Sequence, residues 1–305
     1  MIAMKTKERV FWASRRLGYR RSRARQYKLM NIAAISGTTN PTETLRSSGS
    51  DEIWEGMSQC AEEHEMALHT YSFHHNEPTL RFEDVPVLLR RDQMDGVVIL
   101  NAVSPAFLDF LRQARIPTVV ASNFALPYPV DQVRTDSVVG GRMLTRKLLE
   151  HGHRHIAYLA AGAERLIDQE LYRGFEEVMR EHKRFDAALV RLYKEQPLRG
   201  ISAPDELLRS DPRPTAIVTA HWHGACQVAF AANRLGIDFR SGLEIATTTR
   251  AENLDFVFPV VYLEQHLTGM GRKAVERLME LHQNPRQKPK VITVACSVKA
   301  VPPSM

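Results

Sequence analysis

The chain has 305 residues, of which 44% are hydrophobic and 25% charged, so it is long enough to bury one large or two modest cores. Its net charge is +6. It has no run of about 18 apolar residues, no apolar stretch behind the basic N-terminus, and no CxxC pair among its three cysteines. We therefore expect a cytoplasmic protein without a membrane anchor, a disulfide framework or a zinc site.

The first thirty residues indicate a short helix followed by a basic linker. They hold ten Lys or Arg and one acid, which leaves the remainder of the chain mildly acidic. Val10, Trp12, Ala13 and Leu17 lie near helical spacing with charges between them, and Gly18-Tyr19 ends that pattern. A basic arm on a mildly acidic body is typical of a protein that contacts a polyanion with one end only.

From Asn31 onward, short apolar runs alternate with amphipathic helical stretches. Continuous apolar runs indicate strands that are covered on both faces, as in a parallel sheet. The predicted strands are 31–36, 66–73, 96–101, 118–122, 155–161, 188–193, 216–220, 244–248 and 291–296, and the predicted helices are 51–65, 104–114, 140–151, 170–182, 224–235 and 267–283. We predict an α/β fold of two similar doubly wound lobes, with a ligand cleft between them at the carboxyl ends of the strands.

Several separated motifs, in a fixed order, carry a family resemblance. The longest are KTKERVFWASRRLGYR (5–20) and VRTDSVVGGRMLTRKLLEHGHRHIAYLAA (133–161). Shorter ones follow at Arg173-Gly174-Phe175, Thr215-Ala216-Ile217, Leu235-Gly236-Ile237 and Gly271-Arg272-Lys273-Ala274. Together they resemble the lactose-repressor/galactose-repressor (LacI/GalR) family of bacterial transcription regulators, over nearly the whole chain. The resemblance implies an effector domain of two periplasmic-binding-protein-like lobes, and a homodimer that matches a palindromic operator.

In that family two further helices precede the one matched by residues 5–20, and the second of them reads bases in the major groove. This sequence starts after that helix. We expect a start assigned too late, with a trimmed chain or a decayed gene as alternatives. The linker stands where the family has a hinge helix that wedges a Leu into the minor groove. We expect DNA contact there, mainly to phosphates and without sequence preference, through Arg20, Arg21, Arg23, Arg25, Tyr27 and Lys28.

The effector cleft departs from the family pattern. Leu171 stands where relatives usually carry an Arg, His221-Trp222 replaces an Asn-Asp pair, and Thr249-Arg250 replaces an Asp pair. Fewer carboxylates and additional Trp, His and Arg favour an anionic or partly apolar effector, such as a uronate, over a neutral monosaccharide. The expected effector contacts are Asp136, Arg165, His221, Trp222, Thr249, Arg250 and Gln265, with a helix N-cap as the alternative for Asp136.

We expect three crossings between the lobes, near Glu150-His151, Leu263-Glu264 and 287–290. The predicted organisation is a remnant headpiece helix and hinge at 1–30, an N-terminal lobe of 31–150 plus 264–287, a C-terminal lobe of 151–263 plus 288–298, and a tail at 299–305.

The chain has no Walker, dinucleotide or GxSxG motif, and the histidines at 151, 153 and 155 have no acidic or thiol ligand at zinc spacing. We therefore predict no enzyme activity, cofactor or metal. The sequence predicts a transcription regulator controlled by a small, sugar-like effector. The alternative is a stand-alone cytoplasmic solute sensor that has lost specific DNA binding. Repression and activation are both open.

Overall fold

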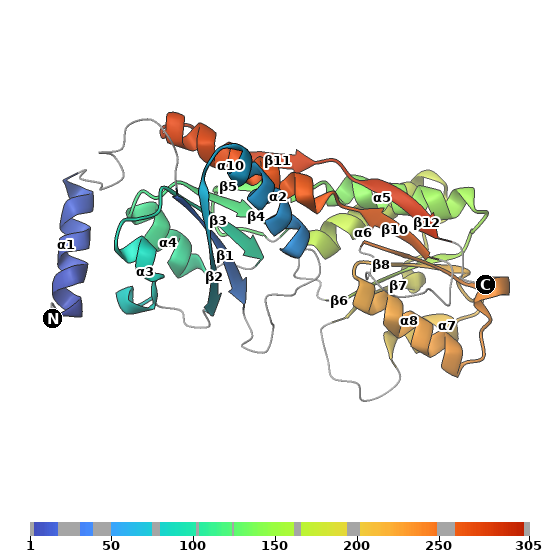
Figure 1. The fold of residues 1–305 in the computed structure, drawn as a ribbon. Coiled ribbons are helices and arrows are strands. Elements are labelled where there is room, and N and C mark those ends of the chain that lie inside the picture. Colours follow the sequence, from blue (N-terminus) through green and yellow to red (C-terminus); the bar gives the residue numbers. More distant parts are fainter. Residues whose placement is uncertain are drawn as a thin grey trace. The chain divides into compact units, whose positions relative to one another are not determined.

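The computed structural model describes residues 3–17, 31–38, 50–74, 80–101, 104–123, 125–161, 166–193, 202–248 and 260–301. The chain divides into two compact units. The first, here called the N-lobe, comprises Met1–Arg134 and Leu267–Val294, and the second, the C-lobe, comprises Thr135–His266 and Ala295–Met305. Each contains a six-stranded sheet covered by helices (Figure 1). No helix of the described residues is both long and apolar enough to cross a membrane.

The N-lobe sheet has the strand order β11-β5-β4-β3-β1-β2. Neighbours from β5 to β2 all pair in parallel. Its elements are α1 (Met4–Arg16), β1 (Asn31–Thr38), α2 (Ser50–Glu63), β2 (Ala67–His74), η2 (Phe82–Asp84), α3 (Val87–Arg90), β3 (Gly96–Asn101), α4 (Pro105–Gln113), β4 (Thr118–Ala121), β5 (Asp131–Thr135), α10 (Leu267–Gln283) and β11 (Val291–Val294). Residues of β1 alternate between the two core layers. Ile32 packs with α2 and α10, and Ile35 packs with α3 and α4.

The C-lobe sheet has the order β12-β10-β9-β8-β6-β7, parallel except for the antiparallel pair β10 and β12. Its elements are α5 (Ser137–Glu150), β6 (Ile156–Ala161), α6 (Leu166–Glu181), η3 (Ala187–Leu189), β7 (Val190–Tyr193), α7 (Ala203–Leu208), β8 (Ala216–Thr219), α8 (Trp222–Arg234), α9 (Phe239–Gly242), β9 (Glu244–Thr247), β10 (Val260–Glu264) and β12 (Ser297–Val301). Tyr158 of β6 packs with α5 and α6, whereas Leu159 packs with α7 and α8. The sheets are therefore buried on both faces, and the expected pair of doubly wound lobes is confirmed.

The lobe boundaries differ from the expected ones. The crossing expected at 150/151 lies at 134/135, because α5 packs against α6, β10 and β12 of the C-lobe. The second crossing lies at 266/267, three residues after the expected place. Strand β11 pairs with the N-lobe sheet beside β5, although we expected 291–296 in the C-terminal lobe, so the third crossing lies at 294/295. The residues that follow form β12, which we did not predict, and complete the C-lobe sheet.

Helix α1 forms as predicted but turns a different face toward the protein. Phe11 and Arg15 are buried, each 5% exposed. Val10 and Leu17, which we placed on the apolar face, are 63% and 84% exposed. The expected DNA contacts at 20–28 lie outside the described residues.

The motif glycines of the C-lobe allow α5 and α6 to cross closely. A Cβ on Gly174 would lie 2.1 Å from the carbonyl oxygen of Val138, and a Cβ on Gly141 would lie 2.2 Å from that of Leu171. In both cases the added methyl group would meet backbone atoms, which cannot move aside by a change of rotamer. The resemblance at Gly141 and Gly174 therefore reflects helix packing.

We expect Gly174→Ala to lower the free energy of unfolding by about 1–2 kcal/mol, because α5 and α6 must separate to admit the methyl group. The matched control is Gly269→Ala in α10, where the nearest atom to a new Cβ is 3.8 Å away. There the better helix propensity of alanine should stabilise the protein by about 0.5–1 kcal/mol. Urea denaturation followed by circular dichroism compares the two, and equal shifts in the same direction would contradict the packing argument.

Candidate functional site

The candidate site lies where parallel strands of the C-lobe end. Strand β8 is followed by His221 and Trp222, and β10 by Gln265. Helix α6, which follows β6, carries Asp168 in its first turn. Strands β6 and β8 are neighbours in the sheet, so the segments that follow them start side by side. The carboxyl edge of such a sheet is where doubly wound folds bind ligands.

Asp168 is a fully buried carboxylate, 0% exposed. Its Oδ1 lies 2.7 Å from Nε2 of His221. Among the described residues neither oxygen receives an aligned hydrogen bond, so this is a close contact of opposite charges when the imidazole is protonated. The backbone of Asp168, by contrast, is fixed, because its carbonyl accepts a hydrogen bond of 2.9 Å from the hydroxyl of Tyr158. A buried carboxylate with unused acceptor capacity is costly unless a partner supplies donors.

His221 connects this carboxylate to the surface. It precedes α8 with an extended backbone, and its carbonyl accepts hydrogen bonds from the Thr219 hydroxyl (3.2 Å) and the Ala225 amide (3.3 Å). Its side chain is 29% exposed. Because Nε2 faces Asp168, Nδ1 is the nitrogen left to contact a solute. Trp222 is half-buried and packs against the core layer between the sheet and α8, so part of its ring is already occupied.

The other expected effector contacts are placed only in part. Asp136 is the N-cap of α5, and its Oδ1 accepts a hydrogen bond of 3.0 Å from the Val139 amide, as our alternative for it proposed. Gln265 is half-buried between β10 and α10. Arg165, Thr249 and Arg250 lie outside the described residues. The structure therefore brings His221 together with Asp168, which the sequence did not single out.

Asp168 lies one turn before Leu171 on α6, and Leu171 is 1% exposed in the core layer of α5 and α6. The missing arginine at Leu171 was visible in the sequence, whereas a role for the carboxylate three residues earlier was not predicted. A carboxylate in a first helical turn is usually a response to the helix dipole, so nothing local marked it. Its presence weakens our inference that the site is poor in hydrogen-bond acceptors.

The histidines before β6 have a structural partner. Nδ1 of His151 lies 3.0 Å, and Nε2 of His153 2.8 Å, from the carboxylate of Glu244, which begins β9. The sequence shows no acid at zinc spacing from these histidines, and Glu244 lies 91 residues after His153. No cluster of three or more His, Cys, Asp or Glu side chains suited to a metal ion occurs among the described residues. Burial raises the pKa of Glu244, but the hydrogen bonds from His153 and His151 lower it by more, so its pKa lies below the ordinary 4.5.

A carboxylate with a lowered pKa stabilises the fold above its unfolded-state pKa and loses that contribution as pH falls through the folded-state value. We expect Glu244→Gln to lower the free energy of unfolding at pH 6 by about 1–3 kcal/mol, the range for hydrogen bonds to a charged group. The difference from the wild type should shrink as pH falls below about 4. Urea unfolding at pH 6 and pH 3.5 measures it. A difference that is unchanged at pH 3.5 would contradict the assigned linkage.

The two lobes, each with a mainly parallel sheet between helices, define an α/β effector domain of the periplasmic-binding-protein type. The family model described as "Periplasmic binding proteins and sugar binding domain of LacI family" matches residues 41–300. The chain belongs to this family.

Relatives and solved structures agree with this assignment. The HTH-type transcriptional repressor PurR of Actinobacillus pleuropneumoniae serotype 3 (strain JL03) is 25% identical over 209 residues, which cover 67% of this chain and 62% of the repressor. The chain thus spans less than two thirds of the length of this relative. The transcriptional regulator CelR–cellobiose complex superposes with a TM-score of 0.72 at 20% identity, covering 98% of this chain and 90% of that one. A LacI-family regulatory protein from Chloroflexus aggregans gives 0.73 at 20% identity, covering 88% and 96%.

Proposed function

We propose that this chain is the effector-binding part of a transcription regulator, and that a small solute binds in the C-lobe at Asp168 and His221. The observation that carries the proposal is the fully buried Asp168 carboxylate, which no described residue satisfies with an aligned hydrogen bond. The relative PurR is named as a transcriptional repressor, which supports a regulatory rather than an enzymatic role. We also propose that the protein acts as a homodimer in the cytoplasm, where DNA is available.

The chemistry at Asp168 favours an effector rich in hydroxyl groups. A hydroxyl can donate to the carboxylate and also accept from a neighbouring group, as sugars do. The imidazole of His221 adds a polar group that is partly exposed, and Trp222 offers part of an apolar face. We keep a sugar acid or sugar phosphate as the proposed effector class, because Arg165 follows β6 and Arg250 follows β9 in the sequence. Neutral sugars are the competing class that Asp168 supports.

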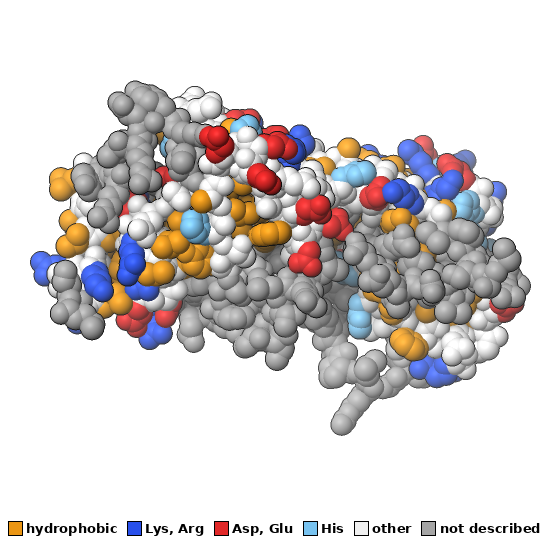
Figure 2. Space-filling model, in the orientation of Figure 1, with side chains coloured by type: hydrophobic (Ala, Val, Ile, Leu, Met, Phe, Trp, Pro, Cys, Tyr) orange, Lys and Arg blue, Asp and Glu red, His pale blue; other side chains and the backbone are white. Residues whose placement is uncertain are grey.

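We propose DNA contact through the basic segment 18–30. Over the described residues on the face drawn in Figure 2, acidic and basic side chains are intermixed. Segment 18–30 instead holds five Lys or Arg and no acid. A single-sign segment of this kind binds phosphates with little sequence information and with strong salt dependence. The second candidate function, a solute sensor without specific DNA binding, predicts the same effector site.

Thermal unfolding with neutral sugars, uronates and sugar phosphates tests the effector site, since a ligand of the native state raises Tm by mass action. We expect at least one class to raise Tm, and His221→Ala to abolish the rise. His223→Ala, which removes an exposed histidine two residues later, is the matched control. The site assignment fails if His221→Ala responds like the control. Stabilisation by neutral sugars alone would remove the case for an acidic effector.

Titrating an operator-like and a scrambled duplex at two salt concentrations tests the DNA contact. We expect weak binding without sequence preference that declines steeply with salt. A large preference for the operator-like duplex that survives high salt would show that the chain recognises a DNA sequence. No binding of either duplex at low salt would favour the second candidate function, the solute sensor.

A further inference from the structure

We infer that Glu264, His266 and Ser297 form a clip that holds together the two chain segments by which the C-lobe joins the N-lobe after β10 and before β12. The clip is a conformational device: when closed it keeps both segments short, and when open it lengthens them. The length of these segments limits how far the two lobes can move against each other. All three residues belong to the C-lobe, so the inference stands on contacts within one lobe and goes beyond the proposed effector site.

The clip lies where two paired strands separate. Strands β10 and β12 pair antiparallel, and Glu264 with Ser297 is the last pair of their ladder (Figure 1). Two residues on each strand, 265–266 and 295–296, separate this pair from the crossings at 266/267 and 294/295. We call residues 264–266 and 295–297 the fork. Because the backbone ladder ends at Glu264 and Ser297, side chains decide whether the strands stay together beyond it.

Ser297 joins the other two members of the clip. Its hydroxyl donates to Oε2 of Glu264 at 3.0 Å, and its oxygen lies 3.1 Å from Nε2 of His266. Since the hydroxyl hydrogen is directed to the carboxylate, the oxygen is left to accept from the imidazole. Nε2 of His266 also lies 3.9 Å from the Glu264 carboxylate. One side chain of β12 thus contacts residues on both sides of Gln265.

Glu264 is an ionised acceptor at neutral pH. Nζ of Lys299 lies 2.5 Å from its Oε1. This hydrogen bond lowers the pKa of Glu264 below the ordinary 4.5, with burial opposing it and the bond from Ser297 adding to it. Hydrogen bonds to a carboxylate are stronger than those between neutral groups. The Lys299 side chain is 51% exposed, so its own ion pair contributes little, and the contact with Ser297 matters more for the clip.

The backbone of His266 has a conformation that needs support. Its φ is +49°, in the left-handed region, which histidine adopts more readily than most residues but still at a free-energy cost. Its side chain is 47% exposed, and the contacts with Ser297 and Glu264 orient it. The clip therefore ties a strained turn to β12. Without that connection the turn can relax, and the chain between β10 and α10 gains length.

Cys296 lies inside the fork and can report on its opening. Its Sγ lies 3.9 Å from the carbonyl oxygen of Asp136, which follows the crossing at 134/135. Burial raises the pKa of the Cys296 thiol, so the closed fork keeps the reactive thiolate scarce. Opening of the fork exposes this thiol to water, and the rate at which it is alkylated then measures the opening.

Alkylation by iodoacetamide, followed for each cysteine by peptide mass spectrometry, tests the clip in the full chain. We expect Ser297→Ala to speed the labelling of Cys296 by about three- to tenfold, because the hydroxyl that joins the two other side chains is lost. Ser297→Thr, which keeps a hydroxyl, should label at nearly the wild-type rate. The matched control is Ser210→Ala, which removes another half-buried serine hydroxyl of the C-lobe, bonded to a backbone carbonyl at 2.7 Å.

The other two cysteines are internal references. Cys60 is fully buried in the N-lobe and Cys226 is half-buried on α8, and neither should label faster in Ser297→Ala. Each rate is divided by that of the same variant unfolded in urea, which removes any direct effect of the substitution on the neighbouring thiol. Hydrogen exchange is the second measurement. Residues 262–266 and 297–299 should exchange faster in Ser297→Ala, while β6 keeps its protection.

The clip is overturned if Ser297→Ala behaves like Ser210→Ala in both measurements. It is also overturned if Cys60 and Cys226 accelerate as much as Cys296, because the loss of stability is then global. Equal labelling of Ser297→Thr and Ser297→Ala would contradict the role of the hydroxyl. None of these outcomes depends on an effector, so the clip and the proposed function can fail separately.

Discussion

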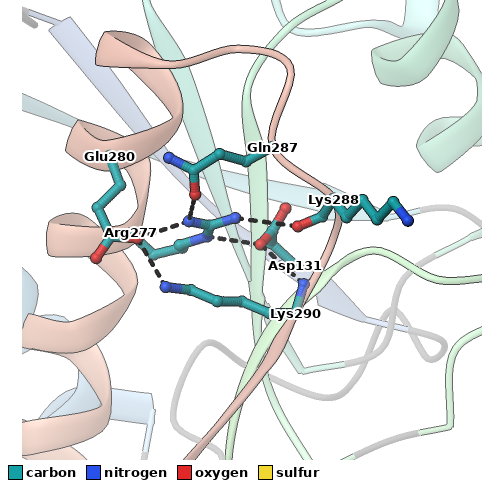
Figure 3. A network of polar contacts seen from close by, with 6 residues as sticks. All are labelled: Asp131, Arg277, Glu280, Gln287, Lys288 and Lys290. Carbon is teal, nitrogen blue, oxygen red and sulfur yellow. Dashed lines mark hydrogen bonds and ion pairs between the residues drawn. The ribbon is translucent and has the colours of Figure 1, made fainter.

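Arg277→Met is expected to lower the free energy of unfolding by about 3–5 kcal/mol, the usual cost of removing one partner from a buried ion pair. Arg277 of α10 is fully buried, and its Nε lies 2.6 Å from Oδ1 of Asp131 in β5 (Figure 3). Its Nη1 contacts Glu280 at 2.6 Å and the Gln287 side chain at 2.5 Å. Without the guanidinium, the Asp131 carboxylate, which is 7% exposed, keeps its charge and loses its main counter-charge.

The matched control for this prediction lies on the same helix. Arg272 makes an equally short ion pair with Glu63, but their side chains are 36% and 52% exposed. An exposed pair contributes about 0–1 kcal/mol, so Arg272→Met should be nearly neutral. Guanidinium unfolding of both variants gives the comparison. Similar losses of unfolding free energy in Arg277→Met and Arg272→Met would show that the burial of Arg277 does not strengthen its ion pair.

His221→Leu is expected to lower the free energy of unfolding by about 2–3 kcal/mol at neutral pH, because it leaves the buried Asp168 carboxylate without the imidazole that lies 2.7 Å from it. The estimate lies below that for Arg277 because His221 is 29% exposed. Adding Asp168→Asn to the His221→Leu variant should recover most of the lost stability, because a neutral amide then replaces the buried carboxylate. Thermal and urea unfolding of the two single variants and the double variant measure the coupling. Additive losses would mean that the two side chains are independent.

The sequence was most informative where burial is uniform. GVVILN of β3 is apolar at nearly every position because helices cover both faces of the sheet, and such a run is visible without any partner. DQVRT of β5 gave no such signal, because its Asp131 is satisfied by an arginine 146 residues further along the chain. The sequence did not predict β5, β10 or β12, and the buried ion pair accounts for β5 alone, since β10 (VVYLE) is an apolar run.

Only part of the candidate site was predictable from the sequence. His221 and Trp222 stood out because they replace residues that the family usually carries. Asp168 did not, because its meaning depends on a histidine 53 residues later, brought near by the pairing of β6 with β8. Likewise, the spacing of Val10 and Leu17 suggested an apolar face for α1. The face that is buried instead uses the ring of Phe11 and the ion pair of Arg15, whose partner Asp92 lies far along the sequence.

Strands β11 and β12 close one edge of each sheet, and both come from residues 291–301. A ribosome must therefore pass residue 291 before either sheet can receive its last strand. Until then β5 and β10 are edge strands, with unpaired amides and carbonyls open to other chains. Any nascent or prematurely terminated product that stops before 291 would carry two such edges at once. The nine residues of β11 and β12 thus protect both lobes against aggregation during synthesis.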